Sequence, residues 1–156
     1  ATLVADPRRA GTRYRLANTF FADGYVPQAI EQYKQTLRAN PRLFEAANRL
    51  ARILTTHPDE TVRSDQEGLI LASRLCAVTR RQNPRFLDTL AGAQANAGQH
   101  EKAVKTAEMA LRLYRKDERL TEEAAALEAR LPLFRAGKAY REDAWDKEPS
   151  RRGSTP

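Results

Sequence analysis

The fold of this chain is decided by the stretch RLANTFFADGYVPQAIEQYKQTLRANP, residues 15–41. On each side of Gly24, apolar and small residues return at helical spacing. Side chains spaced in this way share one face of an α-helix, and glycine permits the backbone of a tight turn between helices. The stretch therefore predicts two antiparallel amphipathic helices closed by Pro41. The apolar and small positions are Leu16, Ala17, Phe20, Phe21, Ala29, Tyr33 and Leu37.

The two proline dipeptides that flank this hairpin, Asp6-Pro7 and Asn40-Pro41, stand 34 residues apart. Self-similarity at such a period is typical of helical hairpins repeated along a chain. Asn40 is predicted to cap the following helix and Pro41 to lie in its first turn, because the amide that proline lacks would be unbonded there. An array of hairpins exposes a curved surface, which favours the binding of another protein over catalysis.

The pattern returns after Asn83-Pro84, and a longer unit lies in between. In that middle unit the turn is stretched from His57 to Arg63, and Pro84 follows Pro41 by 43 residues. Ser64 with Glu67 predicts a capping box at the start of the unit's second helix. The matching residues of the third hairpin are Leu90, Ala91, Gly98, Ala103, Ala107, Ala110 and Leu111.

A last helix is predicted from about Leu120 to Arg135, after a polar break at residues 116–118. It has the character of the helix that caps such arrays, with an apolar face toward the last hairpin and charges outward. Pro132 is expected to kink or split it, because proline removes one backbone hydrogen bond and clashes with the preceding turn. Gly137 ends it, and the polar composition beyond predicts disorder from about Lys147.

The repeated positions resemble the consensus of the tetratricopeptide repeat. The residues that carry the resemblance are Leu16, Ala17, Phe20, Gly24, Ala29, Tyr33 and Pro41. Arg13 departs from the consensus, which prefers Trp, and Thr36 departs where Ala is preferred. The resemblance implies an all-α fold, a right-handed superhelix of antiparallel helix hairpins with a C-terminal capping helix.

The expected boundaries follow from these units. Residues 1–9 are the end of a preceding repeat or an N-terminal flank, 10–43 the first unit, 44–83 the irregular second, 84–116 the third, 117–140 the capping helix and 141–156 a flexible tail. The chain begins at Ala1 rather than Met, so we expect a fragment, the C-terminal part of a bacterial array. Some arrays that it resembles are appended to membrane glycosyltransferases, which leaves open that this is the recognition or assembly module of such an enzyme.

In the tetratricopeptide family, partners bind the concave face formed by the first helix of each hairpin. An Asn amide can satisfy a peptide backbone on both sides, and a guanidinium can grip a carboxylate bidentately. We therefore expect a polar, net basic strip of Asn18, Asn48, Arg52 and Arg85 that binds a protein or an acidic peptide. The resemblance implies a groove of Tyr14, Asn18, Phe21, Asn48, Arg52, Thr55, Arg85, Asp88 and Asn96.

The match to a carboxylate-gripping groove is partial. Tyr14 stands where Lys is expected, and Thr89 where a basic residue is usual. A generic groove, or a face used mainly to pack neighbouring repeats, stays open as an alternative.

The formal charge of +7 and pI of 9.9 leave open an acidic peptide, anionic lipid or nucleic acid as partner. Basic and acidic residues are interleaved, which is typical of a solvated surface. Nucleic acid is not the expected partner, because Phe20, Phe21 and Tyr33 are needed in the core and few aromatic side chains are left to stack on bases. Its phosphate contacts would be Arg8, Arg9, Arg13, Arg15, Arg80, Arg81 and Arg85.

No enzyme motif is found. The only histidines are His57 and His100, both in predicted turns, and no phosphate-binding or nucleophile motif occurs. We expect no cofactor, metal or small-molecule substrate. Cys76 is predicted to be a buried structural thiol. No apolar run is long enough to span a membrane, and the compartment stays open. An uncovered apolar face on the first helix predicts that this fragment could form a homodimer.

Overall fold

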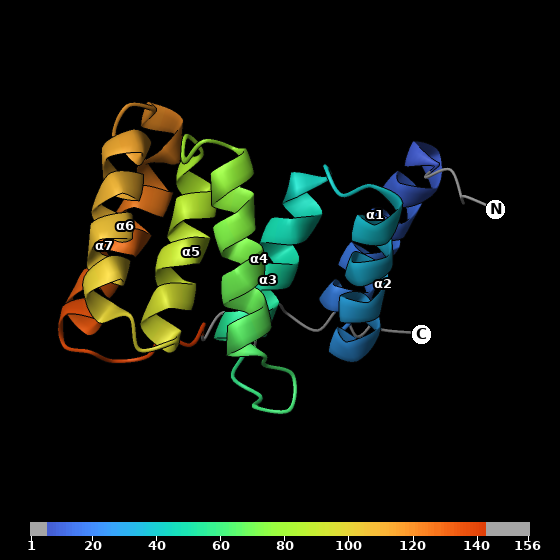
Figure 1. Cartoon of the computed structure of the whole chain (residues 1–156), viewed down its shortest axis with the longest axis horizontal. Coiled ribbons are helices and arrows are strands. Elements are labelled where there is room, and N and C mark those ends of the chain that lie inside the picture. Colours follow the sequence, from blue (N-terminus) through green and yellow to red (C-terminus); the bar gives the residue numbers. More distant parts are fainter. Residues whose placement is uncertain (1–5, 143–156) are drawn as a thin grey trace, which may run out of the picture.

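The computed structural model describes residues 6–142, and every regular element in that range is helical. Successive helices run antiparallel and stand side by side from α1 at one end to α7 at the other (Figure 1). The predicted all-α stack of hairpins is confirmed. The helices are α1 (Pro7–Ala22), α2 (Val26–Ala39), α3 (Phe44–Thr56), α4 (Asp65–Val78), α5 (Pro84–Asn96), α6 (His100–Tyr114) and α7 (Thr121–Arg135), and a 3-10 turn (Glu118–Leu120) precedes α7.

Three helices end in the same glycine turn. Gly24, Gly98 and Gly137 have φ values of 81°, 78° and 69° after α1, α5 and α7. In each turn the glycine amide donates to the carbonyl three residues back, and the next amide donates to the carbonyl five residues back. This pairing satisfies the last carbonyls of a helix and requires a left-handed residue, which glycine adopts without strain. After α1 and α5 this turn sends the chain back along the helix it has just left, and after α7 it leads into the segment that runs toward α5 and α3.

The end of α4 uses the same pairing without glycine. Arg80 and Arg81 have φ values of 54° and 55°, and the Arg81 amide donates to the Cys76 carbonyl at 2.8 Å. The left-handed backbone costs a residue with a Cβ atom roughly 1–2 kcal/mol. The turn between the second and third hairpins is therefore a strained point of the stack.

Two predicted helix starts differ from the structure. The Asn40 carboxamide accepts from the Arg42 amide at 3.0 Å and holds a turn, so α3 begins only at Phe44. Ser64 does precede α4, but its side chain makes no capping bond, and Glu67 pairs instead with Lys34 of α2 at 3.0 Å. The capping box was therefore a wrong prediction, because an ion pair with the neighbouring hairpin competes for Glu67.

The predicted cap of α5 is confirmed, and the predicted break in α7 is not. Asn83 caps α5 by accepting from the Arg85 amide at 3.0 Å, with Pro84 as the first helical residue. The helix α7 is not split by Pro132 and continues to Arg135. Pro132 lies exposed in the last turn, where only one backbone bond is lost. The predicted disorder from Lys147 lies outside the described residues.

The stretched turn between α3 and α4 is held by side chains. The Asp59 carboxylate accepts from the Thr61 amide at 2.8 Å and from its hydroxyl at 2.7 Å. The Arg63 guanidinium donates to the carbonyls of His57 and Pro58 at 2.9 and 2.8 Å. Figure 1 shows this loop projecting beyond the end of the hairpin. The turn is thus an ordered loop outside the packed helices.

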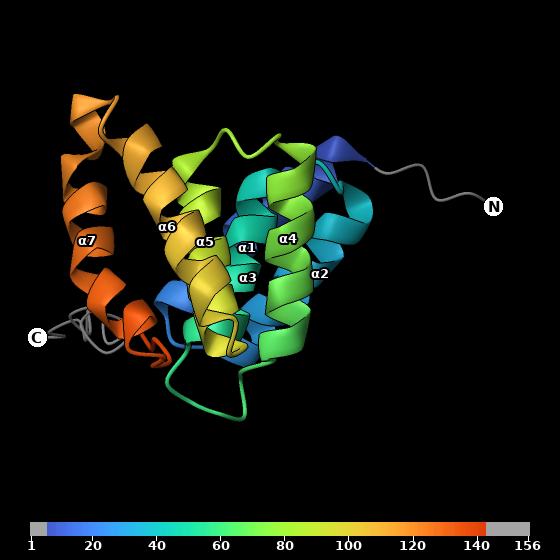
Figure 2. The same ribbon diagram turned by 60° about the vertical axis from the view of Figure 1, so that its left-hand side comes forward.

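The buried apolar side chains form two clusters. The larger one joins α3 to α7, and Figure 2 shows α7 beside α6 at one end of the stack. The smaller one joins α1 and α2 to one side of α3 around Tyr33. Cys76 is buried as predicted, and burial raises the pKa of its thiol to about 11. Leu16 was expected to pack, yet it is 42% exposed. The homodimer expected on this face stays a prediction.

Candidate functional site: a groove between α3, α5 and α7

A hollow of about 450 Å³ lies between α3, α5, α7 and the segment that follows α7. The helices α3 and α5 are the first helices of the second and third hairpins, which is where the concave face was expected. Each of these two helices presents one face to the hollow, because side chains three or four positions apart lie on the same face of a helix. The lining residues are Glu45, Asn48, Arg49, Arg52, Thr56, Arg85, Asp88, Thr89, Gly92, Tyr114, Glu123, Ala126, Arg130, Tyr140 and Glu142.

Charges in the groove are balanced rather than net basic. Four arginines and four carboxylates line it. Arg85 pairs with Glu123 of α7 at 3.3 Å, and Arg52 pairs with Glu142. The expected basic strip is therefore neutralised by the chain's own acidic residues, and the surplus positive charge of the protein lies elsewhere.

A partly buried network at one wall fixes α7 against α5. Both oxygens of Asp88 accept from the Arg130 guanidinium, at 2.7 and 2.9 Å, and the Tyr114 hydroxyl donates to Asp88 at 3.2 Å. The two charged side chains are only 15% and 17% exposed. Burial lowers the pKa of Arg130, but the charge and hydrogen bonds of Asp88 outweigh it, and the net shift is upward. Arg130 is therefore held charged, and a planar bidentate pair sets the position of α7.

The segment after α7 crosses the groove. The Tyr140 amide donates to Asn96 Oδ1 at 2.7 Å, and Asn96 Nδ2 donates to the Thr55 carbonyl at 2.6 Å. The Glu142 amide donates to the Thr56 carbonyl at 2.9 Å. Figure 1 shows this red segment running below α5 toward α3. Asn96 thus bridges the segment and the end of α3.

Six of the nine groove residues expected from the sequence lie at this site. Asn48, Arg52, Arg85 and Asp88 line the hollow. Asn96 and Thr55 lie at its end, and Thr55 contributes its carbonyl, because its methyl group packs against Gly68 of α4.

The other three, Tyr14, Asn18 and Phe21, lie on α1 and do not line the hollow. The Tyr14 and Tyr33 rings pack with centroids 6.2 Å apart, and the Tyr33 hydroxyl donates to Asn18 Oδ1 at 2.7 Å. Phe21 packs on the smaller apolar cluster. These side chains are used within the first hairpin and its junction with α3.

One polar atom in the groove lacks a partner. The carboxamide oxygen of Asn48 is buried, and no hydrogen-bond donor reaches it within the part of the chain that the structure describes. A buried acceptor without a donor is unfavourable by about 1–3 kcal/mol. Asn48 therefore carries an unsatisfied acceptor at the wall of the hollow, and its side chain would have to turn before a ligand N–H group could reach that oxygen.

Sequence reasoning missed Arg130, Tyr140 and Glu142 as groove residues. Arg130 shares a face of α7 with Glu123 and Ala126, and that helical spacing on a predicted helix could have indicated it. Tyr140 and Glu142 carry no such signal, because an extended segment has no helical period to reveal which side faces the protein.

Comparisons with known proteins identify the class of fold. No protein-family model and no curated protein sequence matches the chain. Among solved structures, it is similar to the first TPR of Spaghetti (RPAP3) bound to the HSP90 peptide SRMEEVD, with 18% identity and a TM-score of 0.63. The alignment covers 83% of this chain and 98% of that one. The chain therefore has the tetratricopeptide-type fold that its repeated positions predicted.

Among residues 6–142, no helix has the length and apolar character needed to cross a membrane. Within the same residues, no three His, Cys, Asp or Glu side chains gather as a metal site would require.

Proposed function

We propose that this chain is a protein-interaction scaffold that binds an acidic peptide segment in the groove between α3, α5 and α7. The observation that carries the proposal is Arg52, whose guanidinium already binds a carboxylate at the groove. The structural neighbour was solved with a peptide that contains three acidic residues, which supports the same ligand class. We assign no catalytic role to the groove, since the fold is typical of interaction modules.

The chemistry of binding follows from three side chains on rigid helices. Arg52 would hold a carboxylate of the peptide, and the unpaired Asn48 oxygen would accept a peptide amide once the side chain turned toward the hollow. Asn96 on α5 would offer its carboxamide oxygen to an extended main chain, as it does to the Tyr140 amide, while its amide stays bonded to the Thr55 carbonyl. Because α3 and α5 pack directly on one another, little ordering is needed when the peptide binds.

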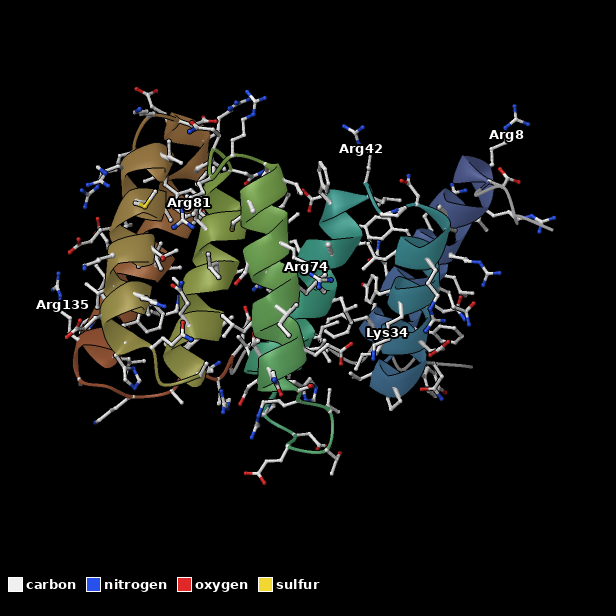
Figure 3. The ribbon with its side chains drawn as sticks, viewed as in Figure 1. Arg8, Lys34, Arg42, Arg74, Arg81 and Arg135 are labelled. Carbon is white, nitrogen blue, oxygen red and sulfur yellow. The ribbon has the colours of Figure 1, made fainter. Side chains whose placement is uncertain are left out.

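The distribution of basic side chains favours a peptide over nucleic acid. Figure 3 shows Arg8, Lys34, Arg42, Arg74, Arg81 and Arg135 spread from one end of the stack to the other. Lys34 pairs with Glu67 at 3.0 Å, and Arg135 with Glu108 at 3.6 Å. Phosphate binding needs cations gathered along one track. A role as the recognition module of a larger bacterial membrane enzyme remains compatible with a peptide groove.

The test is a fluorescence anisotropy titration of the full chain with labelled SRMEEVD peptide. We expect Arg52→Ala to weaken binding about tenfold, because one charge-assisted contact is lost. The matched control is Arg112→Ala, an exposed arginine on α6 away from the groove. A second control is the same peptide with its Glu and Asp residues replaced by Gln and Asn. Wild type should bind this peptide as weakly as Arg52→Ala binds the acidic one. Equal affinity for both peptides, or an unchanged Arg52→Ala variant, would contradict the proposal.

A further inference from the structure

We propose that residues 139–142 are an internal ligand of the groove, and that an external acidic peptide binds by displacing them. The inference rests on the proposed function, since it concerns competition for the same site. It also describes the ligand that the groove prefers: an extended segment with an aromatic side chain two residues before a carboxylate.

The main chain of the segment is bound as an extended peptide. The amides of Tyr140 and Glu142 each donate a hydrogen bond, and the two residues lie two positions apart in the chain. The first goes to Asn96 on α5 and the second to the Thr56 carbonyl at the end of α3. Amides two positions apart point to the same side of an extended chain. The segment thus joins two helices by the bonds that a bound peptide would make.

The side chains of the segment occupy the groove's recognition groups. The Glu142 carboxylate pairs with Arg52 and accepts from the Thr56 hydroxyl at 3.3 Å. The side chain of Glu142 is only 15% exposed. The Arg130 guanidinium lies 4.9 Å from the centre of the Tyr140 ring, a cation–π contact. An external carboxylate on Arg52 would have to replace Glu142.

The segment can leave without unfolding the stack. The turn at Gly137 completes α7, and the last helical bond runs from the Lys138 amide to the Leu133 carbonyl at 2.9 Å. The buried anchors of α7, such as Leu131 and Phe134, all precede this turn. Release of residues 139–142 therefore breaks the contacts that these residues make with α3, α5 and Arg130, the ion pair of Arg141 with Asp65 of α4, and the packing of Tyr140 on the larger cluster.

Tethering explains why weak contacts can hold the segment. The Arg52 side chain is partly exposed, and an ion pair of that kind contributes little by itself. Only a few residues separate Glu142 from α7, and a short tether gives an effective concentration of about millimolar or more. A peptide in solution must compete with that concentration, which predicts a moderate inhibition of about fivefold to tenfold.

The experiment compares wild type with the Tyr140→Ala/Glu142→Gln double variant in the full chain. The probe is the labelled SRMEEVD peptide, and hydrogen exchange at the amides of Tyr140 and Glu142 in wild type is measured by NMR. We expect both amides to be protected, and the double variant to bind the probe about fivefold to tenfold more tightly. Glu122→Gln, which removes an exposed carboxylate on α7, is the matched control and should bind as wild type does.

Each outcome decides one of the two proposals. Equal affinity in wild type and double variant, with binding still about tenfold weaker in Arg52→Ala, overturns the internal ligand and leaves the proposed function standing. Exchange of both amides at the rate of an unstructured chain also overturns the internal ligand. If the probe binds neither protein, the proposed function fails, and protection of the two amides then supports occupancy of the groove by the segment. Circular dichroism of each variant checks that it remains helical.

Discussion

The first and third hairpins have the same repeated residues and different surroundings. Leu16 of α1 and Leu90 of α5 stand at equivalent positions, yet Leu16 is 42% exposed and Leu90 only 2%. The helix α5 packs against α3, α4 and α6, whereas α1 packs mainly against α2. A repeat position thus specifies which side of a helix faces a neighbour, while the neighbours present in the stack determine whether that side is buried.

The groove side shows a second difference between these hairpins. The position of Tyr14 in α1 is taken by Asp88 in α5, counted from the equivalent leucines. Tyr14 packs on Tyr33 within its own hairpin, and Asp88 reaches across to Arg130 of α7. Tyr14 also interacts with Arg49 of α3, so both positions reach a neighbouring element, but only Asp88, in the second half of the molecule, lines the hollow.

The largest expected effect comes from truncating the two equivalent leucines. Leu90→Ala should lower the free energy of unfolding by about 3 kcal/mol, because it leaves a cavity in the larger cluster. Leu16→Ala should lower it by less than about 0.5 kcal/mol, as is usual for exposed positions. Urea denaturation of both variants measures the difference. Similar losses would mean that α1 is covered in solution, as in the predicted homodimer.

The next effect tests the ion pair that Asp88 of the third hairpin makes with Arg130 of α7. Asp88→Asn should destabilise the protein by about 2 kcal/mol, since it leaves the largely buried Arg130 without its anion. Tyr14→Phe, at the equivalent position of the first hairpin, should change stability by less than about 1 kcal/mol. Urea denaturation gives both values, and hydrogen exchange in α7 locates the loss. An Asp88→Asn variant with unchanged protection of α7 would contradict this account of the pair.

A smaller effect should be equal in the two hairpins. Gly24→Ala and Gly98→Ala both place a Cβ atom on a left-handed residue, and no atom lies within 4 Å of either Cβ position. Each should therefore lose about 1 kcal/mol, through backbone strain alone. Thermal denaturation of the two variants provides the comparison. A clear inequality would show that one turn depends on packing rather than on backbone conformation.

The last prediction concerns how the stability contribution of Tyr33 depends on pH, and its effect is seen only in alkaline solution. Burial raises the pKa of Tyr33 to about 12 from 10.0, and the charge of Arg49 opposes this. A raised pKa favours the protonated folded state, so its contribution is fully present below pH 10 and is lost as the pH rises to about 12. Tyr33→Phe should flatten this part of the stability profile, as measured by urea denaturation across that range. An identical decline in the variant would assign the loss to other groups, such as Tyr114, whose pKa burial also raises.

Much of the fold could be predicted because its causes are local in the sequence. Ala17, Ala29 and Tyr33 recur at helical spacing and are buried together, and the glycine turns follow from single residues. The start of α3 was misplaced, because Asn40 can cap a helix or hold a turn and local sequence does not decide between them.

The groove could be predicted only in part. Arg52, Asn48 and Asp88 are placed by the register of helices that the sequence reveals. The partner of Arg52 lies 90 residues further along the chain. Contacts between residues so far apart in the chain depend on how the whole stack is arranged. Because one partner lies in an extended segment, no helical periodicity in the sequence predicts them.

The loop between α3 and α4 lets this repeat be longer in sequence without altering how its two helices pack. Arg63 and Asp59 hold the extra residues in a closed loop beyond the hairpin, so α3 and α4 pack on each other as a shorter turn would allow. The extra residues lengthen the sequence period of this unit, and α3 and α4 still pack on each other. The same loop is therefore a natural site for inserting a tag or a further domain, since an added segment would extend away from the helices on both sides of the hairpin.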